Sequence, residues 1–129
     1  GHWSDDPDFV SSWPVHCRAG SEGAEFAGHL LSDEDFDSVF KKGEYEAAYS
    51  GFEGKNEDGT LLGDWLKERE VTQVTVIGIA YDYCVAATAA SSAIAGFDTT
   101  VLSQYAASVS SSNNDMVVTL LHQVGVTVL

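Results

Sequence analysis

Residues 74–80 read Val74-Thr75-Val76-Ile77-Gly78-Ile79-Ala80 and form the centre of a run, 71–80, that is almost entirely β-branched or apolar. Such runs are typical of strands covered on both faces of a parallel sheet. The next stretch, from Tyr83 to Ala95, is rich in Ala, Ser and Thr and ends at Gly96. This composition suits a helix that packs closely on a sheet and stops at a left-handed glycine. The two stretches together predict a strand followed by a crossover helix.

The same alternation continues on both sides of this pair. Upstream, apolar residues share one face of residues 61–70, which predicts a helix that Thr60 could cap. Alternating strands and helices are typical of an α/β fold with a parallel sheet and right-handed crossovers. We therefore expect about four strands in the sheet. The remaining predicted elements are a short strand over 38–42 ended by Gly43, a strand over 98–103, a helix from Asn113 or Asn114 to Val124, and a strand over 126–129.

The length and the charge of the chain limit the classes of function that it can have. The 129 residues are 44% hydrophobic, which is enough for one core, so residues 1–129 are interpreted as a single domain. A formal charge of −14 leaves the chain unable to neutralise phosphates, which excludes nucleic acid as a partner. No apolar run is long enough for a membrane span, and residues 1–6 lack signal-peptide features, so a cytoplasmic location is expected. Adaptation to high salt is an open alternative explanation of the acidic excess.

Cys84 is the residue best placed for chemistry. It follows the most apolar strand and stands in the first turn of the next helix, at the sheet edge where open α/β proteins bind ligands. Unpaired N–H groups and the positive end of the helix dipole stabilise a thiolate there. The alternative is a small buried apolar residue, because free cysteines are among the most buried side chains. Cys17 has no such setting and is interpreted as structural, and two cysteines do not predict a disulfide framework.

Lys42 and two histidines are weaker candidates. Lys42 is expected at the end of a short strand, where a lysine near a cysteine favours the thiolate, although a strand-end lysine is usually solvated. His2 and His16 lie in one long irregular segment, and neutral imidazole is the commonest metal ligand. Two histidines without a third ligand make no metal site, and Gly1-His2 is equally what an expression tag leaves behind.

Several segments of the chain resemble one known family. They lie in the same order as in that family and cover essentially the whole chain. The family is the nicotinamidase (pyrazinamidase) branch of the isochorismatase-like cysteine hydrolases, and its fold is a doubly wound parallel sheet with helices on both faces. The segments that carry the resemblance are Trp13-Pro14-Val15-His16-Cys17, Gly20-Ser21-Glu22-Gly23-Ala24-Glu25-Phe26, Phe40-Lys41-Lys42-Gly43, Ala48-Tyr49-Ser50-Gly51-Phe52 and Gly78-Ile79-Ala80-Tyr81-Asp82-Tyr83-Cys84-Val85.

The resemblance implies an amidohydrolase that converts nicotinamide and water to nicotinic acid and ammonia. In its terms Cys84 is the nucleophile that forms a thioester, and Lys42 is the catalytic lysine. The backbone N–H groups of Ala80 and Cys84 match the oxyanion hole, with a cis peptide bond expected at Ile79-Ala80.

The resemblance also implies a metal and a ring-binding pocket. His2 and His16 match two ligands of a divalent ion, which is zinc, iron or manganese and holds the pyridine nitrogen of the substrate. Trp13 and Tyr49 match aromatic walls around the ring, and Ile79 belongs to the same substrate-binding set.

Parts of the family pattern are absent from this sequence. The family needs an aspartate as general base, in a segment resembling Asp-x-Gln-x-Asp-Phe, and upstream Asp and His metal ligands. We therefore expect a partial domain that lacks the first strands, with the missing segment on another chain, cleaved off or left out. Alone it is expected to be inactive, and its unpaired strand edge should favour association, homo-oligomers included. Tyr81, where the family often has threonine, is expected to alter the pocket wall.

Two alternatives remain open. One is a different isochorismatase-like hydrolase without a metal, which the matches at His2 and His16 disfavour and which bound metal would exclude. The other is a non-catalytic protein of the same fold that binds a pyridine or a partner. Slow alkylation of Cys84 by iodoacetamide, no faster than that of a free peptide, would favour the binding protein.

Overall fold

The computed structural model describes residues 3–28 and 31–129, and in them the chain forms a three-stranded parallel sheet flanked by helices. The sheet order is β1-β2-β3, so each strand pairs with the next one along the chain. The predicted α/β class with a parallel sheet is confirmed. The strands are β1 (Gln73–Ile79), β2 (Asp98–Ala107) and β3 (Thr127–Val128), and the α-helices are α1 (Leu62–Glu68), α2 (Ala86–Ile94) and α3 (Asn114–Gln123).

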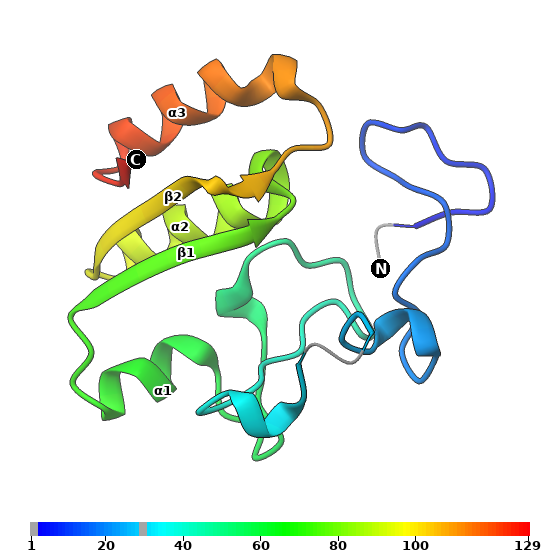
Figure 1. Ribbon diagram of the computed structural model, residues 1–129, viewed down its shortest axis with the longest axis horizontal. Helices are drawn as coiled ribbons and strands as arrows, with labels where there is room; N and C mark the ends of the chain where they lie inside the picture. The colour runs from blue at the N-terminus through cyan, green and yellow to red at the C-terminus, as the bar shows by residue number, and fades with distance from the viewer. Residues whose placement is uncertain (1–2, 29–30) are drawn as a thin grey trace.

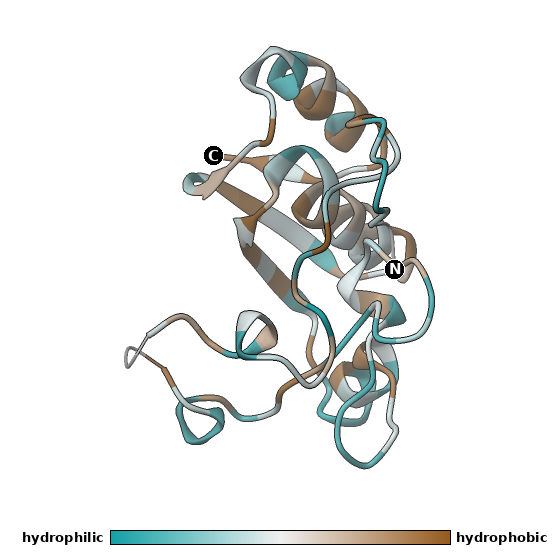
Figure 2. Cartoon of the chain, turned by 90° about the vertical axis from the view of Figure 1, so that its right-hand side faces the viewer, coloured by the Kyte–Doolittle hydropathy of each residue, from teal (hydrophilic) through white to brown (hydrophobic). Residues whose placement is uncertain are grey.

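One hydrophobic core lies between the sheet and two of the helices. Both α2 and α3 contribute to it, so both crossover helices cover the same face of the sheet (Figure 1). Hydrophobic residues are frequent in the sheet and the helices, whereas hydrophilic residues are frequent in the loops of the first half (Figure 2). The core residues are Val76, Tyr81, Val85, Ala89, Val101, Val117, Leu121 and Val126.

The other face of β1 is open among the described residues. Successive side chains of a strand point to opposite faces, so Val76 enters the core while Ile77 and Ile79 point away from it. Ile77 is 57% exposed and Ile79 is 77% exposed. The expectation that this strand is covered on both faces is therefore wrong for the described part of the chain. β1 is also an edge strand, because β2 is its one partner in the described sheet.

The predicted strand over 38–42 is not formed. Lys41 makes one isolated antiparallel bridge with Lys55, and each N–H donates to the other's carbonyl, at 2.9 and 3.1 Å. The neighbouring Phe40 packs edge-on against Trp65 of α1, with ring centroids 5.7 Å apart. The apolar residues of this segment thus serve packing against a helix, and the sheet has three strands.

Local signals at the helix ends are partly confirmed. Gly96 has a φ of +96°, as expected of a left-handed glycine after α2. Thr60 does not cap α1, and its N–H donates to the Asn56 side chain. Asn113 does not cap α3 either, since its side-chain amide donates to Asp82.

The first half of the chain is largely irregular, as its composition indicated. Its regular pieces before α1 are 3₁₀ turns at Glu22–Ala24, Asp33–Asp35 and Gly51–Glu53. Within the ranges described, none of the helices combines the length and apolar character needed to cross a membrane. The cytoplasmic location and the salt adaptation stay predictions.

Tyr81 provides a test of the core. Its side chain is 3% exposed, and its hydroxyl has no hydrogen-bond partner among the described residues. Burial raises the pKa of this phenol. Since a buried unsatisfied donor costs about 1–3 kcal/mol, we expect Tyr81→Phe to raise the free energy of unfolding by about 1 kcal/mol in urea denaturation.

The matched control is Tyr105→Phe, because Tyr105 is 63% exposed. That variant should unfold at the same urea concentration as the wild type. A loss of stability in Tyr81→Phe would contradict the assignment of Tyr81 as an unsatisfied core residue.

Candidate active site

Cys84 lies in a turn at the carboxyl end of β1. The strand ends at Ile79, the Ile79–Ala80 peptide bond is cis as expected, and a π-helical turn, Tyr81–Val85, leads into α2. The carbonyl of Ala80 accepts hydrogen bonds from the N–H groups of Tyr83 and Val85, at 3.1 and 3.0 Å. The free thiol of Cys84 is therefore held, half-buried, at the edge of the sheet where ligands bind in open α/β folds.

Lys42 reaches this thiol from the first half of the chain. Its Nζ lies 3.3 Å from Cys84 Sγ, although the two residues are 42 positions apart. The same ammonium donates a hydrogen bond to the carbonyl oxygen of Ala48 at 3.2 Å. The two side chains are therefore in direct hydrogen-bond contact. The structure thus brings together the two residues that the resemblance paired.

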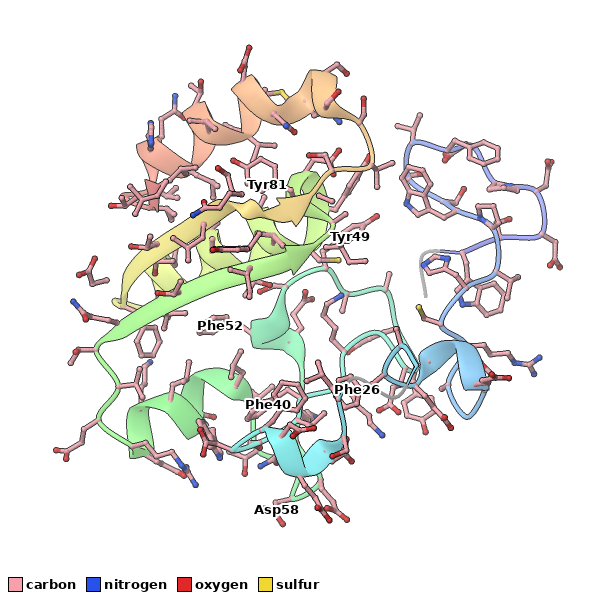
Figure 3. The ribbon with its side chains drawn as sticks, viewed as in Figure 1. Phe26, Phe40, Tyr49, Phe52, Asp58 and Tyr81 are labelled. Atoms are coloured by element: carbon pink, nitrogen blue, oxygen red, sulfur yellow. The ribbon has the colours of Figure 1, made fainter. Side chains whose placement is uncertain are left out.

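A cavity of about 470 Å³ opens beside this pair. Each site residue expected within the described ranges lines it, and His2 lies outside those ranges. The carboxyl ends of β1 and β2 point toward the N-terminal loop, and Tyr49 lies near the end of β1 (Figures 1 and 3). The lining residues are Trp3, Trp13, His16, Cys17, Lys42, Gly43, Ala48, Tyr49, Ile79, Ala80, Tyr83, Cys84 and Val109.

Tyr83 is a central wall residue that the sequence did not single out. Its ring lies edge-on to Trp13 and tilted against Tyr49, with centroids 5.6 Å apart in both pairs. Its position directly before Cys84 was the available signal. Tyr81, expected to alter the wall, is instead buried in the core and is not a lining residue.

Cys17 and the described part of the cavity wall also bear on the chemistry. Cys17 is exposed, is free like Cys84, and lies at the rim of the cavity. Neither Asp nor Glu is among the described residues that line the cavity. The described wall therefore offers two thiols, an ammonium, an imidazole and aromatic rings, and no carboxylate.

Asp82 connects the turn that carries Cys84 to the loop after β2. Its carboxylate accepts hydrogen bonds from the N–H of Val109 (2.9 Å), the N–H of Ser110 (3.0 Å) and the Asn113 side chain (3.1 Å). Burial raises the pKa of this carboxyl, but these hydrogen bonds outweigh burial and the pKa is lowered overall. Asp82 thus ties the loop after β2, including the wall residue Val109, to the turn that carries Cys84.

His16 is the candidate metal ligand that lies within the described residues. Its Nδ1 lies 2.6 Å from the Pro14 carbonyl oxygen. When Nδ1 carries the proton, Nε2 is the ring nitrogen suited to coordination, an arrangement common for metal-bound histidines. Across residues 3–28 and 31–129, no three His, Cys, Asp or Glu side chains gather closely enough to hold an ion. The described residues therefore do not form a metal site by themselves.

The protein-family model of the isochorismatase domain matches residues 3–129 of this chain. The chain belongs to the isochorismatase domain family. Among curated relatives of this isochorismatase domain, the nicotinamidase/pyrazinamidase of Mycobacterium tuberculosis is 48% identical over 109 residues, covering 84% of this chain and 58% of that protein. The nicotinamidase of Escherichia coli is 41% identical over 76 residues, covering 57% of this chain and 35% of that protein. The chain thus spans less than two thirds of these relatives.

Solved structures confirm the fold of this isochorismatase domain. A nicotinamidase/pyrazinamidase from Acinetobacter baumanii aligns with a TM-score of 0.77 and 31% identity, covering 92% of this chain and 59% of that chain. The pyrazinamidase of Pyrococcus horikoshii, solved in complex with zinc, aligns with a TM-score of 0.71 and 27% identity, covering 91% of this chain and 62% of that chain.

Asp82→Asn tests the anchoring of the turn Tyr81–Val85, which carries Cys84. Charge-assisted hydrogen bonds are lost, so we expect the free energy of unfolding at pH 7 to fall by about 1–3 kcal/mol. The folded pKa lies below the ordinary value of 3.8, so the carboxylate's contribution is complete above that pH. It is lost as the pH falls through the folded pKa, so the difference between the two proteins should shrink below about pH 4.

The matched control is Asp98→Asn, because Asp98 is exposed and its carboxylate accepts a 3.3 Å hydrogen bond from the Gln73 side chain. Urea denaturation at pH 7, 5 and 3.5 separates the two sites. Equal stability of Asp82→Asn and the wild type at pH 7 would show that the anchor is dispensable.

Proposed function

We propose that this chain supplies the nucleophile, the lysine and part of the substrate cavity of a nicotinamidase. Such a cysteine amidohydrolase converts nicotinamide, or pyrazinamide, and water into the corresponding acid and ammonia. The observation that carries the proposal is the 3.3 Å contact between Lys42 Nζ and Cys84 Sγ at the wall of an aromatic cavity. The 48% identity to a nicotinamidase/pyrazinamidase supports it.

Cys84 acts as the nucleophile in this proposal. Its thiolate attacks the carboxamide carbon, and the π electrons of the C=O bond move to oxygen. The tetrahedral intermediate collapses as the C–N bond breaks, ammonia leaves, and the acyl group stays on sulfur as a thioester. Water then attacks the thioester, which releases the acid and restores the thiol. Lys42 stabilises the thiolate by its charge before the attack.

The oxyanion of the tetrahedral intermediate is proposed to bind to backbone N–H groups at the turn that carries Cys84. The backbone N–H groups of Ala80 and Cys84 donate to it, as the family resemblance implies. Losing one such donor typically costs about 3 kcal/mol of barrier, so this geometry is a large part of catalysis.

The cavity suits a small aromatic amide. Its volume of about 470 Å³ lies in the range of small-molecule sites. Trp13 and Tyr49 supply aromatic walls around the pyridine or pyrazine ring, and Ile79 adds an apolar contact. Tyr83 joins these rings as a third aromatic wall.

A divalent ion, zinc, iron or manganese, is proposed to bind through His16 and His2 with further ligands from outside the described residues. When bound, it would hold the ring nitrogen of the substrate. The described residues alone do not complete such a site, so no step of the reaction is assigned to the ion. The zinc complex of the Pyrococcus horikoshii pyrazinamidase supports the proposal.

The general base is proposed to come from a segment or second chain that completes the domain. The thiol proton must leave Cys84 before attack and reach the departing amine, and the described cavity wall holds no carboxylate for this. The chain covers 58% of its Mycobacterium tuberculosis relative, which supports this assignment. Residues 1–129 alone are therefore expected to be inactive.

Cys84→Ala should abolish ammonia release from nicotinamide by the completed protein. The purified material is first weighed by intact mass under denaturing conditions, to establish whether a second polypeptide accompanies the 13.8 kDa chain. Ammonia is then measured with and without added zinc or iron. Thr119→Ala, an exposed change on α3, is the matched control and should keep full activity.

The outcomes separate the parts of the proposal. Undiminished turnover in Cys84→Ala would remove the thioester mechanism. Ammonia from the 13.8 kDa chain alone would mean that one of its own carboxylates serves as base. A completed protein that binds nicotinamide and releases no ammonia would support the non-catalytic binding protein.

His16→Asn tests the metal assignment in the completed protein. The substitution removes the imidazole nitrogen proposed to coordinate the ion, so metal content after dialysis should fall at least tenfold, in line with the loss of a direct ligand. Elemental analysis of the dialysed protein gives the readout. The control is His122→Asn, because His122 is exposed near the end of α3 and away from the cavity. Equal metal content in His16→Asn and wild type would rule out His16 as a ligand.

A further inference from the structure

The helix that begins after Cys84, α2, binds a segment from the first half of the chain, the turn around Ser50 and Gly51. Thr88 and Ser91 follow Cys84 by four and seven positions, which is one and two turns along the helical path. The N–H of Gly51 donates to Thr88 Oγ1 at 2.8 Å, and Ser50 Oγ donates to Ser91 Oγ at 2.8 Å. Two hydrogen bonds thus dock the turn around Gly51 onto α2.

The docked turn lies close against the helix. A Cβ atom added at Gly51 would lie 3.3 Å from Thr88 Cγ2 and 3.4 Å from Thr88 Oγ1, which is tighter than ordinary contact. Ser50 is 6% exposed, and the Glu53 carboxylate accepts hydrogen bonds from the N–H groups of Ser50 (2.9 Å) and Tyr49 (3.2 Å). The turn is therefore fixed internally as well as to α2.

The same segment orients Lys42. Ala48, two residues before Ser50, is 5% exposed, and its carbonyl oxygen accepts a hydrogen bond from Lys42 Nζ at 3.2 Å. That ammonium lies 3.3 Å from Cys84 Sγ. The contacts form a closed path from Cys84 along α2 to Thr88, across to the turn, and back through Ala48 and Lys42 to the thiol.

We propose that Thr88 is a positioning residue for the Lys42–Cys84 pair, acting through the docked turn, with Ser91 as its second anchor. The proposal rests on the proposed function in taking Cys84 as the reactive thiol. Thr88 does not touch the cavity and is not a core residue, so its hydroxyl serves the turn. Removing it leaves the Gly51 N–H without its acceptor and frees the Ala48 carbonyl to move away from Lys42.

Alkylation of Cys84 by iodoacetamide at neutral pH tests the proposal on the chain as it is. Mass spectrometry of peptides gives the rate at Cys84 for the wild type, Thr88→Val, Thr88→Ser, Lys42→Met and the double variant Thr88→Val/Lys42→Met. Loss of the ammonium in Lys42→Met should slow alkylation by roughly tenfold. Thr88→Val should slow it roughly threefold to tenfold, as expected from one lost hydrogen bond. Thr88→Ser, which keeps the oxygen, should react at the wild-type rate.

The double variant distinguishes positioning from general stability. If Thr88 acts through Lys42, Thr88→Val should cause no further slowing in the Lys42→Met background, whereas independent effects would multiply. The structural control is Thr99→Val, because Thr99 is 1% exposed and donates to Ser92 Oγ at 2.8 Å in the interior. That variant should be less stable to urea and unchanged in its Cys84 rate.

Four results would overturn the proposal. Three of them concern Thr88: an unchanged rate in Thr88→Val, an equal loss in Thr88→Ser and Thr88→Val, or full multiplication of the two effects in the double variant. An unchanged rate in Lys42→Met would also overturn it, because the positioned contact would then have no consequence. None of these results depends on turnover of nicotinamide, so failure of the proposed function shows separately, as absence of ammonia from the completed protein.

Discussion

The contact between the Lys42 ammonium and the Cys84 thiol joins two halves of the chain that differ in character. Lys42 belongs to an irregular, highly acidic first half, whereas Cys84 belongs to a regular and almost uncharged second half. A 3.3 Å contact between residues so far apart requires the loops of the first half to be held at the carboxyl end of the sheet. The hydrogen bonds from Ser50 and Gly51 to α2 do this close to the thiol. Asp82 fixes the loop after β2 to the turn that carries Cys84. Polar contacts with two different loops therefore hold this turn and the start of α2, while the adjoining core is apolar.

The sheet itself is covered unevenly. α2 and α3 bury one face of it, whereas Ile77 and Ile79 on the other face of β1 are largely exposed. Exposed apolar side chains on an edge strand favour association with a further strand or chain. This open face agrees with the proposal that a further segment or chain completes the domain and brings the carboxylate that the described cavity wall lacks.

Periodicity predicted the second half of the chain well. The apolar run of β1, the small-residue tract of α2 and the glycine at position 96 are local signals, and local signals decide such elements. The short strand over 38–42 failed because Phe40 serves packing on Trp65, a long-range contact that alternation cannot reveal. The pairing of Lys42 with Cys84 came from the family resemblance, since spacing alone left Lys42 a solvated lysine. Thr88 and Ser91 belong to the Ala-, Ser- and Thr-rich tract of α2, whose composition predicted only close packing. Their hydrogen bonds to Gly51 and Ser50 join residues far apart in the sequence, so local patterns could not predict them.

Among the described residues, Lys42 contacts a thiol and not a carboxylate, although the chain is strongly acidic. With 20 acidic residues against 6 basic ones, most lysines of such a protein would be expected to meet a carboxylate. The structure records one ion pair in its described ranges, Arg69 with Glu68 at 3.8 Å, and none at Lys42. Lys42 instead donates to the neutral Ala48 carbonyl, which orients the ammonium without cancelling its charge. A carboxylate in that place would compete with the thiolate for the same cation. Docking the turn through neutral hydroxyl and backbone groups therefore leaves Lys42 Nζ in contact with the Ala48 carbonyl oxygen and with Cys84 Sγ.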